Sequence, residues 1–333
     1  MKAFIINKYG KNEKMSLTNI ADPKLGEHDV LVQIHAASVN LIDSKIKNGE
    51  FKLFLPYKTP FVLGHDVAGV VTKIGEGVKN FKVGDEVYSR PSDMHIGTFA
   101  EYISINEKDV ALKPKNISMA EAASIPLVGL TAWQALVEKA NIKKGHKVFI
   151  QAGSGGVGTF AIQLAKYFGA SVATTTSTSN VDFVKSFGAD IIVDYKNEDF
   201  VDRLNNYDVV LNSQDSGTLI KSLSVLKSEG KIISISGPPD VEFAKEINAP
   251  WYLKFIIKMI SAGIRKKAKI KNVNYSFLFM KSNGQQLNEI TKLIESGSIR
   301  PVIDRVFEFE QANDALAYVE TGRAKGKVVI RVK

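Results

Sequence analysis

The stretch KVFIQAGSGGVG (147–158), with TFAIQLAKYFG (159–169) after it, decides the fold of this chain. Its apolar beginning is typical of a buried strand, and the residues after 158 have the apolar spacing of a helix. Between them, Gly153, Gly155 and Gly158 form a GxGxxG element, which permits a tight turn, close approach to a pyrophosphate and close helix packing. The start of the helix offers free N–H groups to phosphate. We therefore predict a dinucleotide site at Gly153, Ser154, Gly155, Gly156, Val157 and Gly158, with a turn of purely steric purpose as the alternative.

Strands and helices alternate on the C-terminal side of this turn. Strands that are apolar on both faces and joined by helices form a parallel sheet. The fold class is therefore α/β, with a doubly wound parallel sheet. The further predicted strands, separated by helical patterns, are SVATTT (171–176), DIIVDY (190–195), YDVVLNS (207–213) and GKIISISG (230–237).

The N-terminal third of the chain has a different pattern, which indicates a compact β-rich unit. Its short β-type runs, separated by turn residues, are 29–38, 61–75, 83–89 and 97–106. From Ser118, a predicted N-cap, the apolar period becomes helical, and helices are predicted at 118–130 and 131–140. The C-terminal stretch can complete either domain, with a helix (285–297), a strand (305–310), a helix (312–322) and a strand (325–332).

The residues after the second predicted strand indicate which dinucleotide binds. An NAD site usually has an acidic residue about 20 residues beyond the glycines, bound to the ribose 2′-hydroxyl. Here residues 174–180 are TTTSTSN, and the first carboxylate is Asp182. A hydroxyl-rich pocket without a carboxylate accepts a 2′-phosphate, so NADPH is favoured over NADH. No Lys or Arg lies in this segment, and β-propensity with helix capping explains any single hydroxyl equally well.

The composition excludes several classes of chemistry. The 333 residues contain no cysteine, which removes disulfides, thiolate zinc sites, iron–sulfur clusters and cysteine nucleophiles. No stretch reaches the ~18 apolar residues of a membrane span. The start MKAFIINKYG alternates like a strand and lacks the apolar core of a signal peptide. We therefore expect a soluble, cytoplasmic protein.

The net charge of +9 is concentrated in one segment. Residues 251–281 contain eight Lys and Arg residues and no Asp or Glu, so the other 36 basic residues nearly balance the 35 acidic ones. Within this segment, residues 251–264 have an amphipathic helical pattern. The pattern is compatible with a lid over a substrate pocket, a helix on anionic lipid or an RNA-binding patch. We favour a lid-like helix whose apolar face packs on the protein, and we expect neither nucleic-acid binding nor membrane contact.

Further motifs keep one order along the chain: SVNLID (38–43), GHDVAGVV (64–71), VGDEVY (83–88) and GKVVI (326–330). Together with the glycine turn they resemble the medium-chain dehydrogenase/reductase superfamily. Residues 40–45 and 188–195 are similar to its zinc-free quinone oxidoreductase and enone (alkenal) reductase branch.

This resemblance implies two domains. One is a GroES-like, β-rich catalytic domain of residues 1–122 and 300–333. The other is a Rossmann NADPH-binding domain of residues 123–299, which contains a basic lid-like insertion, 238–283. The active site is expected between the domains.

The resemblance also implies catalytic residues, namely Asn40, Asp43 and Lys45. Asn40 is expected to position the nicotinamide ribose or the substrate oxygen. Lys45 is expected to stabilise a developing enolate or to relay a proton. Asp43 either orients Lys45 or caps a helix. A solvated surface lysine is the alternative for Lys45, because Lys47 and Lys52 lie nearby.

Six further residues are expected to contact the cofactor: five match cofactor positions of the family, and Lys327, which follows a glycine in the last strand, is expected to reach the cofactor cleft. For Thr131 the alternative is a threonine that begins a helix, and for Lys327 it is an ordinary edge-strand lysine. The six are Thr131, Ser177, Tyr195, Ser236, Gly237 and Lys327.

Zinc-dependent members of the superfamily hold their catalytic zinc with two cysteines and a histidine. Of these ligands the chain keeps only His65, and one imidazole makes no zinc site. We therefore expect no zinc, and we interpret His65 as a hydrogen-bonded remnant that supports its turn. Hydride delivery to an electron-poor carbon needs no metal when hydrogen-bond donors hold the developing anion.

The resemblance thus implies an NADPH-dependent, zinc-independent oxidoreductase that transfers hydride to quinones or to the C=C bond of α,β-unsaturated carbonyls. Its expected partner is a small-molecule quinone or enone, and its expected state is a homodimer or a monomer. The alternative is a nucleotide-binding protein that contacts RNA or a membrane through residues 251–281. A zinc alcohol dehydrogenase is a third, weaker alternative.

Overall fold

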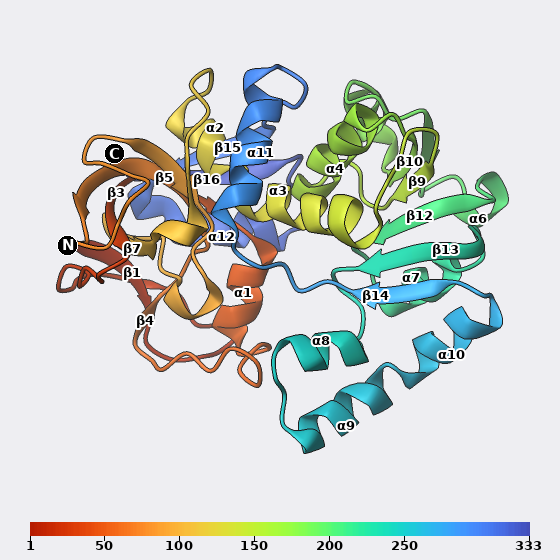
Figure 1. Cartoon of the computed structure of the whole chain (residues 1–333), viewed down its shortest axis with the longest axis horizontal. Helices are drawn as coiled ribbons and strands as arrows, with labels where there is room; N and C mark the ends of the chain where they lie inside the picture. The colour runs from red at the N-terminus through yellow and green to blue at the C-terminus, as the bar shows by residue number, and fades with distance from the viewer. The chain divides into compact units, whose positions relative to one another are not determined.

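The strand that precedes the glycine turn is β9 (Lys147–Ile150), and it lies inside a six-stranded sheet of order β11-β10-β9-β12-β13-β14. The computed structural model describes residues 1–333 (Figure 1). Every neighbouring pair of strands in this sheet is parallel. This is the predicted doubly wound α/β sheet, and the fold class is confirmed. The other strands are β10 (Ser171–Thr176), β11 (Ile191–Asp194), β12 (Tyr207–Asn212), β13 (Leu226–Ser234) and β14 (Asn274–Phe277).

Helices connect these parallel strands, as crossover connections require. They are α4 (Gly156–Tyr167), α5 (Val181–Lys185), α6 (Phe200–Arg203), α7 (Ser216–Ser222), α8 (Val241–Glu246), α9 (Trp251–Ile260) and α10 (Ala262–Ile270), with the 3₁₀ helix η4 (Thr178–Asn180) before α5. On the N-terminal side of β9, α3 (Pro126–Trp133) continues into a π-helical segment, η3 (Gln134–Lys139). The sequence predicts an ordinary α-helix there.

The structure changes the interpretation of residues 238–283 as a lid-like insertion. Strand β14 lies inside this segment and adds a sixth strand to the sheet beside β13. Helix α10 buries Ile264 and Ala268 in the same apolar core as Phe149 and Ile232. Helix α10 is therefore the crossover helix between the last two strands of the sheet. The four-residue strand NYSF is too short and too polar to stand out in the sequence.

Helix α9 contradicts the expectation that the apolar face of residues 251–264 packs on the protein. Ile257 is its buried residue, whereas Trp251 is 82% exposed. The reason is that α10 already covers the sheet, so α9 reaches the core through one side chain. No helix of the structure has both the length and the apolar character required to cross a membrane.

Residues 131–280 form one compact unit, and residues 1–130 with 281–333 form a second, β-rich unit. The larger sheet of the β-rich unit has the order β15-β16-β3-β5-β6-β8, with β7 also paired to β3, and a smaller sheet has the order β2-β1-β4. Its apolar core includes Val30, Ile34 and Val67. The C-terminal strand β16 pairs with β3, so both ends of the chain build this GroES-like unit.

The strands of the β-rich unit are β1 (Lys2–Ile6), β2 (Ser16–Asn19), β3 (Asp29–Val39), β4 (Phe61–Val62), β5 (Asp66–Ile74), β6 (Glu86–Ser89), β7 (Tyr102–Asn106), β8 (Val110–Leu112), β15 (Ile303–Glu308) and β16 (Lys327–Arg331). Its helices are α1 (Leu41–Asn48), α2 (Met119–Ala123), α11 (Gly284–Glu295) and α12 (Ala312–Glu320), with 3₁₀ turns η1 (Asp93–His95), η2 (Glu107–Asp109) and η5 (Phe309–Gln311). Ser118 is the N-cap of α2, as predicted, and forms a capping box with Glu121.

Both boundaries between the units differ from the predicted ones. The second lies at residue 281 rather than 300, because α11 packs on β8 and the Tyr88 hydroxyl donates to the Leu287 carbonyl at 2.7 Å. The first lies at residue 131 rather than 123, because Leu127 of α3 donates its N–H to Asp66 Oδ1 at 2.7 Å.

Candidate functional site

The turn between β9 and α4 has the geometry of a dinucleotide-binding loop. A Cβ on Gly153 would lie 2.2 Å from Thr174 Oγ1, and one on Gly158 would lie 2.3 Å from the Ala152 carbonyl oxygen, so neither position accommodates a side chain. A Cβ on Gly155 would meet only that carbonyl, at 3.5 Å. Gly155 is also the N-cap of α4, and no side chain caps the helix. The turn therefore offers open space and free helix N–H groups, which suit a phosphate.

A rim of hydroxyl and amide groups adjoins this turn. Asn180 Nδ2 donates to Ser177 Oγ at 3.2 Å and to Ser154 Oγ at 3.4 Å, which ties the end of β10 to the glycine turn. The Ser177 and Ser179 hydroxyl oxygens lie 3.4 Å apart. Asn180 Oδ1 and Thr176 Oγ1 are buried and have no hydrogen-bond partner. Because unpaired buried polar groups are costly, this rim fits a ligand that makes hydrogen bonds, such as the ribose and phosphate of NADP(H).

Strand β11 ends at a carboxylate, Asp194. Asp194 accepts hydrogen bonds from Thr178 Oγ1 at 2.5 Å and from Asn197 Nδ2 at 2.7 Å. The bond from Thr178 contributes most to holding the pKa of Asp194 below its usual value. This carboxylate fixes the turn that follows Ser177, and the neighbouring Tyr195 is left exposed.

The loop after β13 holds the predicted residues Ser236 and Gly237. Ser236 Oγ donates to the Gln214 carbonyl at 2.6 Å, and the Gly237 N–H donates to Ser234 Oγ at 2.8 Å. Ser234 Oγ in turn donates to Asn212 Oδ1 at 2.6 Å. These bonds hold the loop against the end of β12, at the carboxyl edge of the sheet where doubly wound folds bind ligands.

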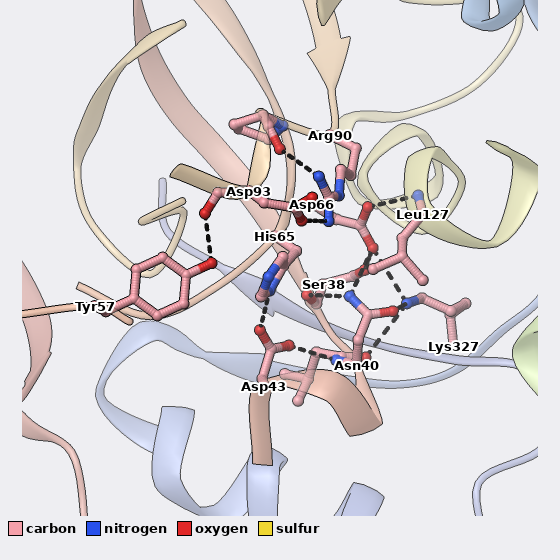
Figure 2. A network of polar contacts seen from close by, with 12 residues as sticks. Ser38, Asn40, Asp43, Tyr57, His65, Asp66, Arg90, Asp93, Leu127 and Lys327 are labelled. Atoms are coloured by element: carbon pink, nitrogen blue, oxygen red, sulfur yellow. Dashed lines mark hydrogen bonds and ion pairs between the residues drawn. The ribbon is translucent and has the colours of Figure 1, made fainter. Parts of the chain in front are cut away.

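The β-rich unit contains a buried network of polar side chains at the start of α1 (Figure 2). Asp43 Oδ1 lies 2.6 Å from His65 Nδ1, and both side chains are fully buried. Asp43 Oδ2 accepts the Asn40 N–H at 2.7 Å, which caps α1. His65 Nε2 is buried and has no partner. Asp43 therefore caps the helix and holds the histidine, and it does not orient Lys45.

Asp66 is the centre of the other half of this network. Its Oδ2 accepts hydrogen bonds from Ser38 Oγ at 2.7 Å and Asn40 Nδ2 at 2.9 Å, and Lys327 Nζ lies 3.3 Å away. Its Oδ1 accepts the Leu127 N–H at 2.7 Å. Figure 2 shows these groups converging on the carboxylate. Such complete pairing offsets the cost of burying the charge.

Lys327 is a positioning residue in this network. An ammonium group has three N–H donors, and that of Lys327 contacts the Val39 carbonyl at 3.3 Å, Asn40 Oδ1, and Asp66 Oδ2 at 3.3 Å. All three donors are occupied inside the protein. Lys327 therefore fixes the Asn40 side chain and has no donor left for a cofactor.

The three lysines within residues 45–52 differ in their contacts. Lys47 is buried, donates to two backbone carbonyls and lies 3.7 Å from Glu320. Lys52 lies over the ring of Tyr9, 5.3 Å from its centroid. Lys45 is half-buried and has no hydrogen bond or ion pair for its ammonium group. Lys45 is therefore the member of this group that is free to meet a ligand.

Tyr57 and Arg90 both contact Asp93 (Figure 2). The Tyr57 hydroxyl donates to the Asp93 carbonyl, and the Arg90 guanidinium pairs with the Asp93 carboxylate. Burial raises the pKa of the Tyr57 hydroxyl far above its usual value, so the hydroxyl stays protonated at physiological pH.

The structure brings some predicted residues together and separates others. Asn40, Asp43 and Lys327 share one buried network, which Lys45 does not join. Thr131 is buried late in α3, so it does not begin a helix. In the Rossmann unit, the glycine turn and the hydroxyl segment after β10 lie side by side.

Sequence reasoning did not identify the role of Asp66, nor those of Tyr57 and Arg90. A signal existed for Asp66, because a carboxylate that opens the apolar strand DVAGVV needs buried partners. No signal existed for Tyr57 and Arg90, which lie in irregular segments without a motif.

Two protein-family models match the chain. Residues 26–115 match the alcohol dehydrogenase GroES-like domain, and residues 187–330 match the family described as zinc-binding dehydrogenase. No group of three or more His, Cys, Asp and Glu side chains in the structure is arranged to hold a metal ion.

The chain is 40% identical to the 2-methylene-furan-3-one reductase of Solanum lycopersicum and 37% identical to the chloroplastic NADPH-dependent alkenal/one oxidoreductase of Arabidopsis thaliana. Each alignment covers 99% of this chain and 79% of the relative. The quinone oxidoreductase structure from Coxiella burnetii is similar with a TM-score of 0.88 and 32% identity, over 100% of this chain and 99% of that one.

The names of these relatives support an oxidoreductase and not the alternative of an RNA- or membrane-contacting nucleotide-binding protein. The expected cytoplasmic location and the homodimeric or monomeric state stay predictions.

Proposed function

Because this chain belongs to the medium-chain dehydrogenase/reductase superfamily and is an oxidoreductase of its quinone and alkenal reductase branch, we propose that it uses NADPH, without zinc, to reduce quinones or the C=C bond of α,β-unsaturated carbonyls. The observation that carries this proposal is the open glycine turn, 153–158, joined to a hydroxyl-rich rim. The Arabidopsis thaliana relative, named as an NADPH-dependent alkenal/one oxidoreductase, supports both the cofactor and the substrate class.

The residues of the Rossmann unit fit NADP(H). The open space at Gly155 and the free N–H groups of α4 suit the pyrophosphate. The unpaired buried atoms of Thr176 and Asn180, with the Ser177 hydroxyl, suit the adenosine ribose and its 2′-phosphate. Bound NADPH supplies a hydride from C4 of its nicotinamide. The further cofactor contacts that we propose are Thr131, Tyr195, Ser236 and Gly237.

Lys45 is the residue that we propose to stabilise the negative charge that hydride addition creates on the substrate. Its ammonium group is half-buried and unpaired, so its N–H donors are free to bind an enolate or quinol oxygen and to give up a proton. Asn40 Oδ1 has two lone pairs, and its contact with Lys327 uses one of them. The other is suited to accept a hydrogen bond from a hydroxyl of the cofactor or substrate. Asp43 acts as a positioning residue, because both its oxygens are already used.

The donor set around His65 does not suit zinc. The chain contains no cysteine, and the carboxylates of Asp43 and Asp66 are taken up by hydrogen bonds inside the protein. Catalytic zinc needs three protein ligands, and His65 Nε2 offers one. This chemistry supports a reaction in which hydrogen-bond donors, rather than a Lewis acid, stabilise the anion.

Substrate turnover tests the proposed function. Purified protein is mixed with NADPH or NADH, a panel of enones and quinones, and a metal chelator, while the absorbance of the reduced cofactor is followed. We expect turnover of at least one class of substrate, preference for NADPH, and no loss of activity in the chelator. Binding of NADPH without turnover of any panel member would refute the proposal.

The role of Lys45 is tested by Lys45→Met, with Lys52→Met as the matched control on the same segment. We expect kcat to fall by about 100-fold or more in Lys45→Met, because general acid catalysis contributes about 10²–10⁴-fold. Lys45→Arg should keep part of the activity and shift the pH profile. Lys52→Met should resemble the wild type. Similar kcat values for Lys45→Met and Lys52→Met would show that Lys45 is a surface lysine.

A further inference from the structure

Helix α9 exposes an apolar face for which the proposed reaction has no use. Trp251, Phe255 and Met259 follow one another at i, i+4 spacing on one side of the helix. All six members of this face are between 45% and 82% exposed. We call it the α9 patch, and it comprises Trp251, Tyr252, Phe255, Ile256, Met259 and Ile260. A contiguous apolar surface of this kind marks an interaction site.

Basic side chains accompany the α9 patch. The exposed lysines of α9 and the α10 region are Lys254, Lys258, Lys266, Lys267, Lys269 and Lys271. No Asp or Glu lies between residues 251 and 281. On the neighbouring helix α8, Glu242 is paired with Lys245 at 2.8 Å and Glu246 with Lys139 at 3.6 Å, so these carboxylates already have partners of their own. Figure 1 shows α8, α9 and α10 as consecutive helices between β13 and β14.

The combination of apolar and basic side chains selects among the possible partners of the patch. A symmetric dimer built on α9 would bring together two copies of a segment that has lysines and no carboxylate to pair with them, which is repulsive. RNA would satisfy the lysines, and its bases would stack on the rings of the aromatic half of the patch, but the aliphatic half, Ile256, Met259 and Ile260, would be left without an apolar partner. An anionic lipid surface satisfies both, since its headgroups attract the lysines and its acyl region accepts the apolar side chains.

The sequence alone led us to expect no membrane contact, but because the apolar face of α9 is exposed, we propose that α9 docks this protein on the surface of a membrane that contains anionic lipids. The ten residues of α9 make a helix of about 15 Å, which is half of the ~30 Å hydrocarbon core. The helix therefore lies along the membrane surface with Trp251 and Tyr252 at the level of the headgroups. This docking does not depend on the proposed reaction, because α9 carries none of the residues assigned to it.

Vesicle sedimentation tests the proposal directly. The full-length protein is mixed with vesicles of phosphatidylcholine alone or of phosphatidylcholine with phosphatidylglycerol. We expect sedimentation with the second kind only, and a loss of affinity of about 10-fold or more when the salt concentration is raised from about 0.05 to 0.3 M.

Three variants separate the contributions of the patch. The triple variant Trp251→Ser/Phe255→Ser/Met259→Ser should abolish sedimentation, because it removes the apolar contact. Lys254→Gln/Lys258→Gln should weaken binding by about 10-fold. The control Lys82→Gln/Val83→Ser removes an exposed lysine and an exposed apolar residue from the β-rich unit and should change nothing. NADPH binding, measured in parallel, confirms that each variant is folded.

Tryptophan fluorescence reports whether α9 itself enters the lipid. The chain has two tryptophans, Trp133 and Trp251, so Trp133→Phe leaves Trp251 as a single reporter. We expect a blue shift of its emission on anionic vesicles, and quenching by lipids with brominated acyl chains.

Several results would overturn the proposal. One is the absence of sedimentation with anionic vesicles at low salt. A second is that the protein binds RNA while brominated vesicles do not quench the emission of Trp251. A third is a dimer in solution that buries Trp251, is broken by Phe255→Glu and does not bind vesicles.

Discussion

The network around Asp66 and the rim around Gly155 are both polar, but they are built in opposite ways. In the β-rich unit, the Asp43, His65 and Asp66 side chains are fully buried, and most of their polar atoms pair with other protein groups. In the Rossmann unit, the glycine turn leaves space, and the buried atoms Thr176 Oγ1 and Asn180 Oδ1 have no partner. The buried network around Asp66 therefore fixes the local structure, whereas the rim around Gly155 has space and polar atoms available to a ligand. The full pairing of the Asp43 and Asp66 carboxylates therefore indicates a positioning role, although His65 Nε2 in the same network has no partner.

Removing the centre of the buried network has the largest expected effect on stability. Asp66→Ala leaves the Lys327 ammonium buried without its carboxylate, and should lower the free energy of unfolding by about 3–5 kcal/mol. Urea unfolding followed by circular dichroism measures the loss, and hydrogen exchange of β3 and β16 locates it. The control Asp22→Ala removes an exposed carboxylate 3.2 Å from the N-terminal amine, and should cost less than about 1 kcal/mol. Equal losses in the two variants would show that the buried network around Asp66 contributes no more to stability than an exposed ion pair.

Alanine substitutions at two glycines of the same turn are expected to affect different properties, NADPH affinity in one case and stability in the other. Gly155 has a φ of −81°, which alanine adopts, so Gly155→Ala should fold normally but weaken NADPH binding by about 10-fold or more, because the added methyl group fills the phosphate space. Gly158→Ala should instead lower stability by about 1–3 kcal/mol, since its Cβ meets the Ala152 carbonyl oxygen. Calorimetric titration with NADPH and thermal unfolding measure the two effects. If Gly155→Ala binds NADPH like the wild type, the turn is not the phosphate site.

A carboxylate placed in the rim tests the preference for NADPH. Ser177→Asp puts a negative charge beside the proposed 2′-phosphate position, and like charges repel. The ratio of kcat/KM for NADPH to that for NADH should fall by about 10-fold or more. Ser171→Asp, at the opposite end of β10, is the matched control and should leave the ratio unchanged. An unchanged ratio in Ser177→Asp would remove Ser177 from the cofactor site.

An exposed ion pair of the Rossmann unit should have the smallest effect. Burial raises the pKa of Asp190, but hydrogen bonds from Lys166 and the Val172 N–H outweigh it and hold the pKa below its usual value. The pair therefore stabilises the folded state above the unfolded pKa of about 3.9, and this contribution is lost as the pH falls through the folded pKa. Because the Asp190 side chain is 41% exposed, Lys166→Met should cost at most about 0.5 kcal/mol at neutral pH.

Urea unfolding of the wild type and Lys166→Met at about pH 7 and at about pH 3 checks this sign. The difference between the two proteins should be smaller at the lower pH than at the higher one. A difference that grows as the pH falls would contradict the assignment.

The sequence could predict those features whose residues lie close together along the chain. The glycine turn lies within six consecutive residues between a strand and a helix, so a local pattern was sufficient. The partners of Asp66 come from residues 38, 40, 127 and 327, and only the folded chain brings them together. No local pattern could therefore show that Lys327 is saturated while Lys45 is free.

Helix α9 and strand β14 show a second limit. The amphipathic pattern of residues 251–264 indicates an apolar face, but it does not say whether another element covers that face. Helix α10, rather than α9, covers the sheet, because α10 leads directly into the added strand β14. That strand is too short to recognise in the sequence. The exposed patch was therefore visible only in the structure.

Isotope transfer tests the central claim, metal-free hydride transfer from NADPH to an electron-poor carbon, most directly. Protein shown by metal analysis to lack zinc is given an enone and NADPH with deuterium at the transferable C4 position, and the product is examined by nuclear magnetic resonance. Our account predicts a reduced C=C bond with deuterium on the carbon β to the carbonyl. A product without deuterium at that carbon, or a reaction that starts only when zinc is added, would contradict it.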